Sequence, residues 1–230
     1  MPYKLKRLTG DEFVRKVLSG ERDFKQIRLG SEFDLSGHDG YESLQTYLKD
    51  NEQMLRLNPV NISESQATNL IAVGLHLPYV LGFNTDLRGS DLSHAYLLRS
   101  NLDGANLRRT NLSGSRIDES GLNSVDFQGA NLEGANLRAS YLGSANFRKT
   151  NLRRTNMRYA GLGQAQFGYA DLENARFESA ILTATDLRHA KNLETVGDLA
   201  YAQFNRTIVS EKEKAIIERA LKDKQLFDVR

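Results

Sequence analysis

The chain has 230 residues, and its 31 Lys and Arg residues against 29 Asp and Glu residues give a formal net charge of +2. It contains no cysteine, which excludes disulfide bonds, thiol catalysis and cysteine-ligated metals. The small net charge argues against nucleic-acid binding driven by overall charge.

The longest apolar stretch, Leu70–Phe83, has 14 residues, which is too short to span a bilayer core of about 30 Å. The N-terminus shows no charged segment followed by a long apolar run, the pattern of a signal peptide. We therefore expect a cytoplasmic protein without a membrane span.

The first predicted element is a helix over residues 11–18. Thr9 is suited to cap its start, and Asp11 in the first turn complements the helix dipole. Gly20 is suited to end it. The pairs Asp23-Phe24 and Arg28-Leu29 then follow at a five-residue offset, which predicts a partial coil of a repeated structure.

Two further helices are predicted between residues 37 and 77. The first covers Tyr41–Leu57, with apolar contacts expected from Leu44, Tyr47, Leu48, Met54 and Leu55. For the second, Ser63 and Gln66 fit a capping box, and Pro78 marks the exit. The inward residues expected for this second helix are Ala67, Leu70, Ile71 and Leu75.

From Leu87 to Leu187, every fifth residue is large and apolar, at 21 positions without a break. The residue two places earlier is Ala, Ser or Thr at 20 of these 21 positions, and Val125 is the exception. A period of five fits neither a helix, at 3.6, nor a strand, at 2. Repetition at a fixed period indicates a solenoid, which we assign to residues 85–190.

A typical block reads Ala130-Asn131-Leu132-Glu133-Gly134. It resembles the pentapeptide-repeat family, whose motif is a small residue, Asp or Asn, Leu or Phe, and two variable residues. The resemblance implies an all-β solenoid, a right-handed quadrilateral parallel β-helix in which four pentapeptides, twenty residues in all, make one coil. Phe127, Phe147 and Phe167 lie 20 positions apart, so we expect them to stack in one column of the core.

The last predicted element is a helix over residues 211–224, where Ser210 and Glu213 form a capping box. Its apolar stripe consists of Ile216, Ile217, Ala220 and Leu221. We expect this helix either to lie over the last coil or to pair with a second copy, since the ends of a solenoid must be covered.

Three segments follow from these elements. Residues 1–84 form an N-terminal helical cap with a partial or interrupted β-helix coil, and residues 85–190 form the β-helix. Residues 191–230 form a C-terminal cap with the terminal helix, so the whole is an all-β solenoid with helical caps.

No catalytic, cofactor-binding or metal site is predicted. The four histidines are scattered and lack the spacing of metal ligands. His38 and Asp39 lie in a glycine-rich stretch that is typical of a surface loop. We therefore expect neither an enzyme nor a cofactor.

Two outward surfaces are candidates for partner binding. Residues 127–170 contain six basic residues and one acidic residue, Glu133, for a net charge of +5. The first candidate is the Arg-rich surface of Arg108, Arg109, Arg148, Lys149, Arg153, Arg154 and Arg158. The alternative is a flat surface with little charge, formed by Gly121, Tyr141, Gly143, Gly161 and Gly163.

The leading hypothesis is a non-enzymatic protein–protein interaction scaffold whose specific role the sequence leaves open. One alternative comes from the family, some members of which bind type II topoisomerases such as DNA gyrase by DNA mimicry and protect them from quinolones. The net positive charge between Phe127 and Ala170 departs from the negative surface of a DNA mimic. A further alternative is binding of nucleic acid or another polyanion through the Arg-rich side, which the small net charge disfavours. Homodimer formation through the C-terminal helix or the rod end is also left open.

Overall fold

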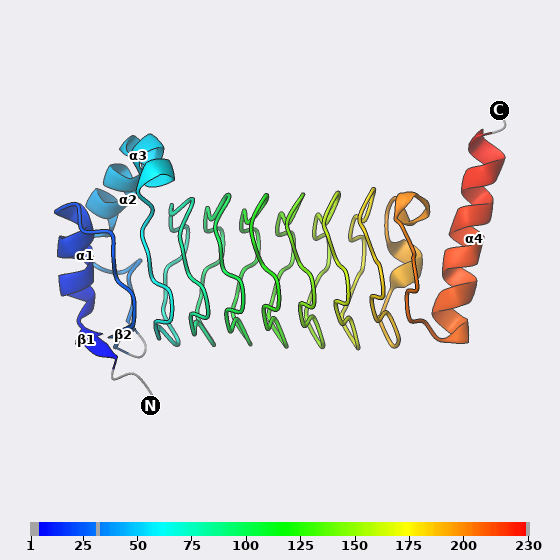
Figure 1. The fold of residues 1–230 in the computed structure, drawn as a ribbon, viewed down its shortest axis with the longest axis horizontal. Helices are drawn as coiled ribbons and strands as arrows, with labels where there is room; N and C mark the ends of the chain where they lie inside the picture. The colour runs from blue at the N-terminus through cyan, green and yellow to red at the C-terminus, as the bar shows by residue number, and fades with distance from the viewer. Residues whose placement is uncertain (1–4, 31–32, 229–230) are drawn as a thin grey trace.

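The computed structural model describes residues 5–30 and 33–228, and for residues 224–228 it describes the backbone alone. The chain forms a rod of stacked coils, with helices at both ends and the two termini at opposite ends (Figure 1). Within the part of the chain that is described, no helix is both long and apolar enough to cross a membrane.

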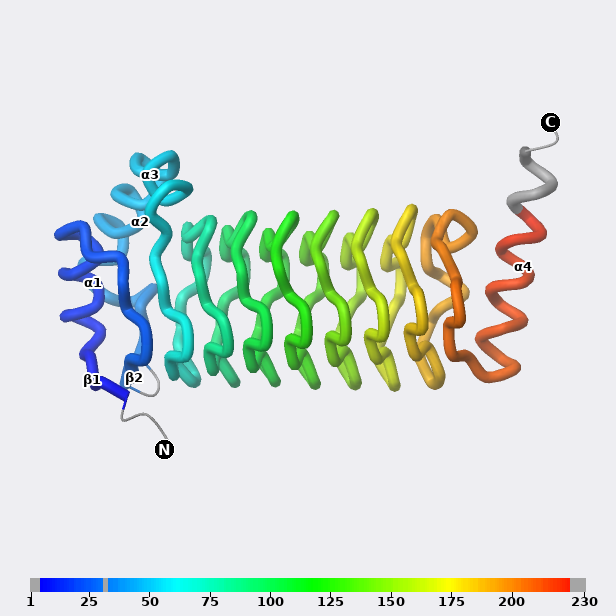
Figure 2. Tube along the Cα trace, viewed as in Figure 1, coloured from blue at the N-terminus to red at the C-terminus, as the bar shows by residue number. Residues whose placement is uncertain are grey.

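Parallel β-bridges join each coil to the next along the rod (Figure 2). From Asn61–Leu81 to Asp171–Lys191, each bridge joins residues that are 20 positions apart. The Leu112 N–H donates to the Asn131 carbonyl at 2.7 Å, and the Asn131 N–H donates to a carbonyl of the preceding coil at 3.0 Å. Backbone polar groups are therefore satisfied between neighbouring coils, as burial requires.

The central residue of each pentapeptide from Leu107 to Leu187 is fully buried. The rings of Phe127, Phe147 and Phe167 stack with centroid separations of 5.1 Å and 4.9 Å, which confirms the column predicted from their spacing. The small corner residues add hydrogen bonds, since the buried Thr150 hydroxyl donates to the Phe127 carbonyl at 2.7 Å.

Helix α1 (Gly10–Leu18) confirms the first predicted element. The Glu12 N–H donates to the Thr9 hydroxyl at 3.1 Å, and the Thr9 N–H donates to the Glu12 carboxylate at 2.8 Å. This capping box satisfies two backbone donors at the start of the helix. Gly20 follows the helix with a φ of +93°, a conformation that favours glycine.

A partial coil lies beside α1. Strands β1 (Lys6–Leu8) and β2 (Ile27–Leu29) pair in parallel. Asp23 bridges Asn61 and Arg28 bridges Gln66, so the two pairs at the five-residue offset are joined to the coil that follows them.

Helices α2 (Tyr41–Asp50) and α3 (Glu52–Leu57) interrupt this first coil. The partners of the Arg28–Gln66 bridge are 38 positions apart where later partners are 20 apart, and the two helices account for most of the difference. The predicted helix is present in two parts. Its residues Leu44, Leu48 and Leu55 are buried and Tyr47 is partly buried, but the expected contact of Met54 is wrong, since this residue is 57% exposed.

The predicted helix that begins at Ser63 is wrong. Bridges join Gln66 to Asp86 and Ile71 to Asp91, so this segment already forms a coil ahead of residue 85. On two sides of this coil the sizes are exchanged, with a small residue, Ala72 or Gly82, at the central position and a large residue, Leu70 or Val80, at the corner. Of the other two sides, one has small residues at both positions and the other has large residues at both, Leu75 and Leu77.

Beyond Lys191, the coils widen, and bridged residues are 21 or 22 positions apart. These coils contain the short 3-10 helices η1 (Leu193–Thr195) and η2 (Leu199–Tyr201), and helix α4 (Glu211–Asp228) packs against both. Ile217 is buried and Ile216 and Ala220 are half-buried, whereas Leu221 is 38% exposed. The helix thus lies over the last coil and leaves the end of its predicted stripe uncovered.

Candidate functional site

The outward residues of the repeats fall into four columns, because bridges align pentapeptides that are 20 positions apart. We name these columns by their first repeat and its equivalents. Side 1 begins at residues 85–89, side 2 at 90–94, side 3 at 95–99 and side 4 at 100–104. The Arg-rich candidate surface extends over sides 1, 2 and 3, and the flat candidate surface lies on side 4.

Side 1 carries most of the basic candidate residues. Arg108 pairs with Asp126 at 3.1 Å, and Arg188 pairs with Asp186 at 2.8 Å. Hydrogen bonds from Arg188 hold the pKa of the Asp186 carboxyl below its usual range. The exposed Arg109, Arg148 and Lys149 form no ion pair with any residue that the structure describes. These three side chains therefore leave positive charge available at the surface.

Arg153 on side 2 and Arg158 on side 3 are compensated by acids of the following coils. Arg153 pairs with Glu173 and lies 3.6 Å from Asp171. Arg158 pairs with Glu178 and lies 3.8 Å from Asp198. The charge counted over residues 127–170 leaves these acids out, since all of them come later in the chain. Of the candidate residues on sides 2 and 3, only Arg154 is exposed without an ion pair in the described structure.

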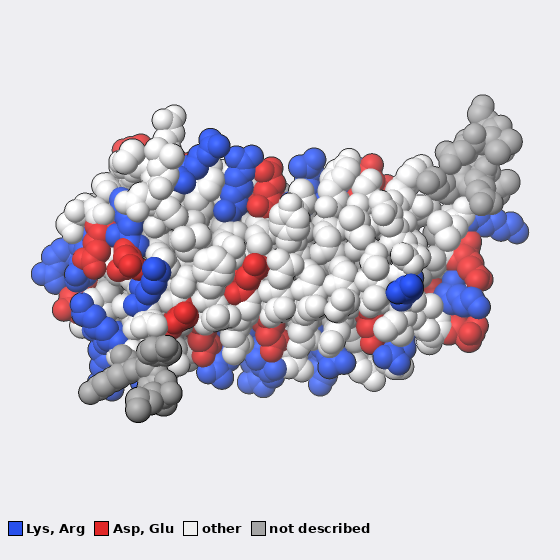
Figure 3. Space-filling model, viewed as in Figure 1, with Lys and Arg blue, Asp and Glu red and all other residues white. Residues whose placement is uncertain are grey.

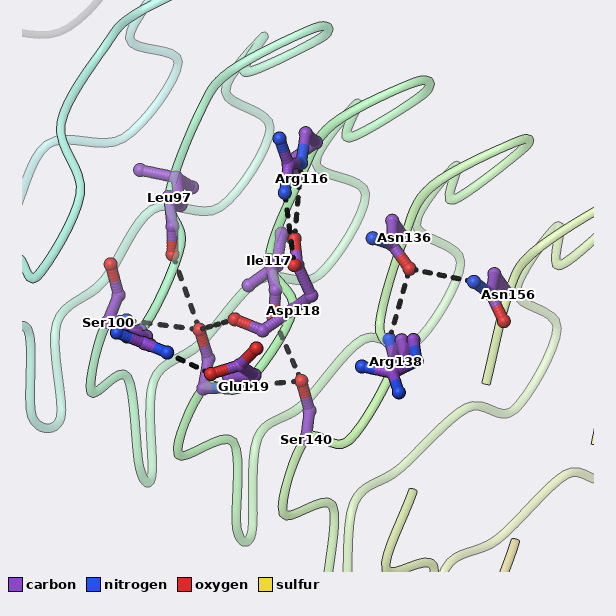
Figure 4. Close-up of polar contacts among 12 residues, drawn as sticks. Leu97, Ser100, Arg116, Ile117, Asp118, Glu119, Asn136, Arg138, Ser140 and Asn156 are labelled. Atoms are coloured by element: carbon purple, nitrogen blue, oxygen red, sulfur yellow. Dashed lines mark hydrogen bonds and ion pairs between the residues drawn. The ribbon is translucent and has the colours of Figure 1, made fainter. Parts of the chain in front are cut away.

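Polar groups on side 3 interlock with each other and with neighbouring coils (Figure 4). Arg116 donates to Asp118 at 3.2 Å, and the Asn156 side-chain amide donates to the Asn136 side-chain carbonyl at 3.0 Å. Arg138 lies over the Tyr159 ring at 4.9 Å. Most charges on this side are therefore engaged within the protein.

The flat candidate surface lies on side 4. Tyr141 forms bridges to Gly121 and to Gly161, and its side chain is 66% exposed. Gly143 and Gly163 lie on the same side, where a hydrogen bond joins the Ser144 N–H to the Gly163 carbonyl at 2.7 Å. Figure 3 shows one face of the rod, on which charged side chains gather mainly along the edges.

His38, from the glycine-rich stretch noted in the sequence, makes hydrogen bonds that join parts of the fold. The His38 Nε2 lies 2.5 Å from the Asp11 carboxylate, and its Nδ1 accepts from the Gly40 N–H at 2.9 Å. His38 thus connects α1 to the start of α2. Among residues 5–30 and 33–228, no cluster of three or more His, Asp or Glu side chains is arranged to hold a metal ion.

Among known families, the one described as "Pentapeptide repeats" matches this chain in eight copies, over residues 83–118, 122–158 and 160–191. No curated protein matches the chain. Among solved structures, HetL is a pentapeptide repeat protein involved in heterocyst differentiation regulation from the cyanobacterium Nostoc sp. strain PCC 7120. It is 21% identical over 87% of this chain and 92% of that chain, with a TM-score of 0.31.

Two other solved structures show similarly distant matches. QnrB1, a plasmid-mediated fluoroquinolone resistance protein, is 14% identical over 70% of this chain and 95% of that chain, with a TM-score of 0.40. A pentapeptide repeat protein from the Arabidopsis thaliana thylakoid lumen is 28% identical over 45% of this chain and 68% of that chain, with a TM-score of 0.29.

Proposed function

This chain belongs to the pentapeptide-repeat family, and we propose that its right-handed β-helix is a non-enzymatic scaffold for binding another protein. One observation carries the proposal. The core residues repeat from coil to coil while the exposed residues vary, as at Leu112 and Leu132, which are both buried and are followed by Ser113 and Glu133. The fold thus separates a constant interior from an adjustable exterior.

The coils hold the outward side chains in place before a partner arrives. Each inner coil is hydrogen-bonded to a coil on either side, which reduces the ordering entropy that binding must overcome. We further propose that each coil is four-sided and consists of four pentapeptides, and that α1 and α4 are caps that shield the ends of the rod. The packing of α4 against η1 and η2 supports a capping role.

Binding to DNA gyrase as a DNA mimic is the alternative function. A mimic of DNA needs a negative surface, whereas the six repeats of side 1 from residue 85 to residue 189 contain six basic and three acidic residues, for a net of +3. We therefore rank this function second. The cytoplasmic location and the homodimer stay predictions.

Crosslinking mass spectrometry in the native cell tests the scaffold. Variants that change outward residues of one side at a time are compared with the wild type, and circular dichroism verifies that each variant is folded. We expect one partner to crosslink to one side and to be lost only when that side is changed. A partner that binds every variant equally, or no reproducible partner, would contradict the proposal.

A gyrase supercoiling assay with and without a quinolone tests the alternative. We expect the wild-type protein to leave both supercoiling and its inhibition by the drug unchanged. Protection of gyrase by the wild-type protein would make the second function the better one.

A further inference from the structure

We propose that side 1 binds an acidic segment of a partner protein through the unpaired cations Arg109, Arg148 and Lys149, here called the cation strip. This inference rests on the proposed scaffold function and specifies the chemistry of the partner. The strip differs from the candidate surface predicted from sequence, because Arg108, Arg153 and Arg158 are engaged in ion pairs within the protein and Arg154 lies on side 2.

The geometry of the coils places these cations along one edge of the rod. Arg109 and Lys149 are the last residues of side 1 repeats that lie two coils apart, or about 10 Å at the usual spacing between strands. Arg148 is adjacent to Lys149, and all three side chains are exposed. An extended or helical segment lying along the rod can therefore contact all three at once.

Glycines in the next coil leave two of these side chains, Arg109 and Arg148, uncovered. The Arg109 Cγ lies 3.7 Å from where a Cβ on Gly129 would be, and the Arg148 Cγ lies 3.6 Å from the same position on Gly168. Each aliphatic stem thus rests on the backbone of the following coil. Because a glycine has no side chain, nothing at positions 129 and 168 screens the two guanidinium groups from an incoming anion.

A surface hollow of about 490 Å³ extends the strip toward the N-terminal end of the rod. Its lining residues are Thr68, Asn69, Arg88, Gly89, Arg108 and Arg109. Asp86 and Asp126 already pair with Arg88 and Arg108, which leaves Arg109 as the open cation of the hollow. The Thr68 hydroxyl and the Asn69 amide add polar groups that suit the side chain of a bound peptide.

The charges of side 1 favour an acidic protein segment over a nucleic acid. Each strand of a nucleic acid carries a phosphate about every 3.4 Å, which is a denser row of charge than the three unpaired cations of the strip can match. The other basic residues of side 1, Arg88, Arg108 and Arg188, are already paired with Asp86, Asp126 and Asp186. Sparse cations separated by polar residues such as Gln128 fit the wider and adjustable spacing of Glu and Asp side chains.

The test uses a short fluorescein-labelled peptide of alternating Glu and Ser, with fluorescence anisotropy at low and at physiological ionic strength. We expect the wild-type protein to bind it and the affinity to fall with salt. The variant Arg109→Gln, Arg148→Gln, Lys149→Gln is expected to lose affinity by about tenfold or more. The control Lys212→Gln, Lys214→Gln, Arg219→Gln removes the same charge from exposed positions of α4 and is expected to bind like the wild type.

The peptide assay would overturn the inference in any of these cases: no binding by the wild type, equal loss in the α4 control, or tighter binding of a single-stranded oligonucleotide of equal charge. Circular dichroism and melting curves verify that both variants stay folded. If a native partner crosslinks to side 3 or side 4 and binds the strip variant normally, the strip is excluded while the scaffold function stands.

Discussion

At the scale of single residues, the last position of each pentapeptide determines how the chain turns its corners. Gly134 has a φ of +66°, and Ala139, at the same position of the next repeat, has a φ of 56°. A residue other than glycine in this left-handed region costs roughly 1–2 kcal/mol. The burial of the central residues, each worth about 1.5–3 kcal/mol, offsets this cost at every corner.

Exchanging glycine and alanine at two adjacent corners tests this cost. We expect Gly134→Ala to lower the free energy of unfolding by about 1 kcal/mol, because the left-handed backbone is its main penalty. A Cβ at this position would have no neighbour within 4 Å, so packing does not complicate the result. Ala139→Gly should raise the free energy of unfolding, by less than about 1 kcal/mol, since glycine also gains entropy in the unfolded chain. Urea denaturation measures both, and changes of the same sign would contradict the account.

At the scale of elements, the β-helix could be predicted from the sequence where a large residue occupies every central position and a small residue occupies every corner. The prediction was wrong at residues 63–75 because Leu70 and Leu75 fill the core from the corners, beside the small Ala72. Together with Ala67 and Ile71, these leucines follow the i, i+3, i+4, i+8 spacing of an amphipathic helix. Only the hydrogen bonds between coils, which connect residues far apart in the chain, distinguish these two structures.

The ion pairs of Arg153 and Arg158 could have been predicted from the sequence. Glu173 and Glu178 follow Arg153 and Arg158 by 20 positions, which is the interval between bridged residues. Counting charge along a continuous segment misses such pairs, because it adds residues that are consecutive in sequence rather than adjacent in space. Tyr141 of the flat candidate surface is 66% exposed, and the role of this surface in binding stays a prediction.

Helix α3 is attached to the rod through His76. The His76 Nε2 lies 3.2 Å from the Glu52 carboxylate of α3, and its ring stacks on Tyr96 at a centroid distance of 4.6 Å. Burial lowers the pKa of the His76 imidazole, and this effect exceeds the opposing attraction to Glu52. Nearby Lys49 lowers the pKa further, so the folded protein favours the neutral ring.

The lowered pKa predicts a loss of stability at acidic pH. Above the unfolded pKa of about 6.5, the ring is neutral in both states and its contribution is fully present. As the pH falls below this value toward the folded pKa, the unfolded state binds a proton more readily, so the free energy of unfolding falls. In urea titrations, the free energy of unfolding of the His76→Gln variant should fall less than that of the wild type between about pH 7 and 5.5. Parallel pH profiles for the two proteins would contradict this assignment.

At the scale of the whole molecule, each coil depends on its immediate neighbours. Deleting residues 131–150 removes one full interval between bridged positions and brings Phe127 into the coil next to Phe167. We expect this shortened protein to fold with a modestly lower melting temperature, as in other repeat proteins with nearest-neighbour contacts. Deleting only Leu132, Glu133 and Gly134 shifts every later central residue to another position, and we expect that protein to unfold or aggregate. Circular dichroism and light scattering measure both, and equal behaviour of the two deletions would contradict this register.

The constant interval between bridged positions also bears on how such a chain can evolve. In-frame duplication of a twenty-codon segment lengthens the rod by about 4.8 Å and adds a new row of outward residues, while the two ends remain unchanged. Mutations at those outward codons are then free to accumulate without disturbing the core. The length of a binding face and its chemical character can therefore be selected separately, the first by duplication and the second by point mutation.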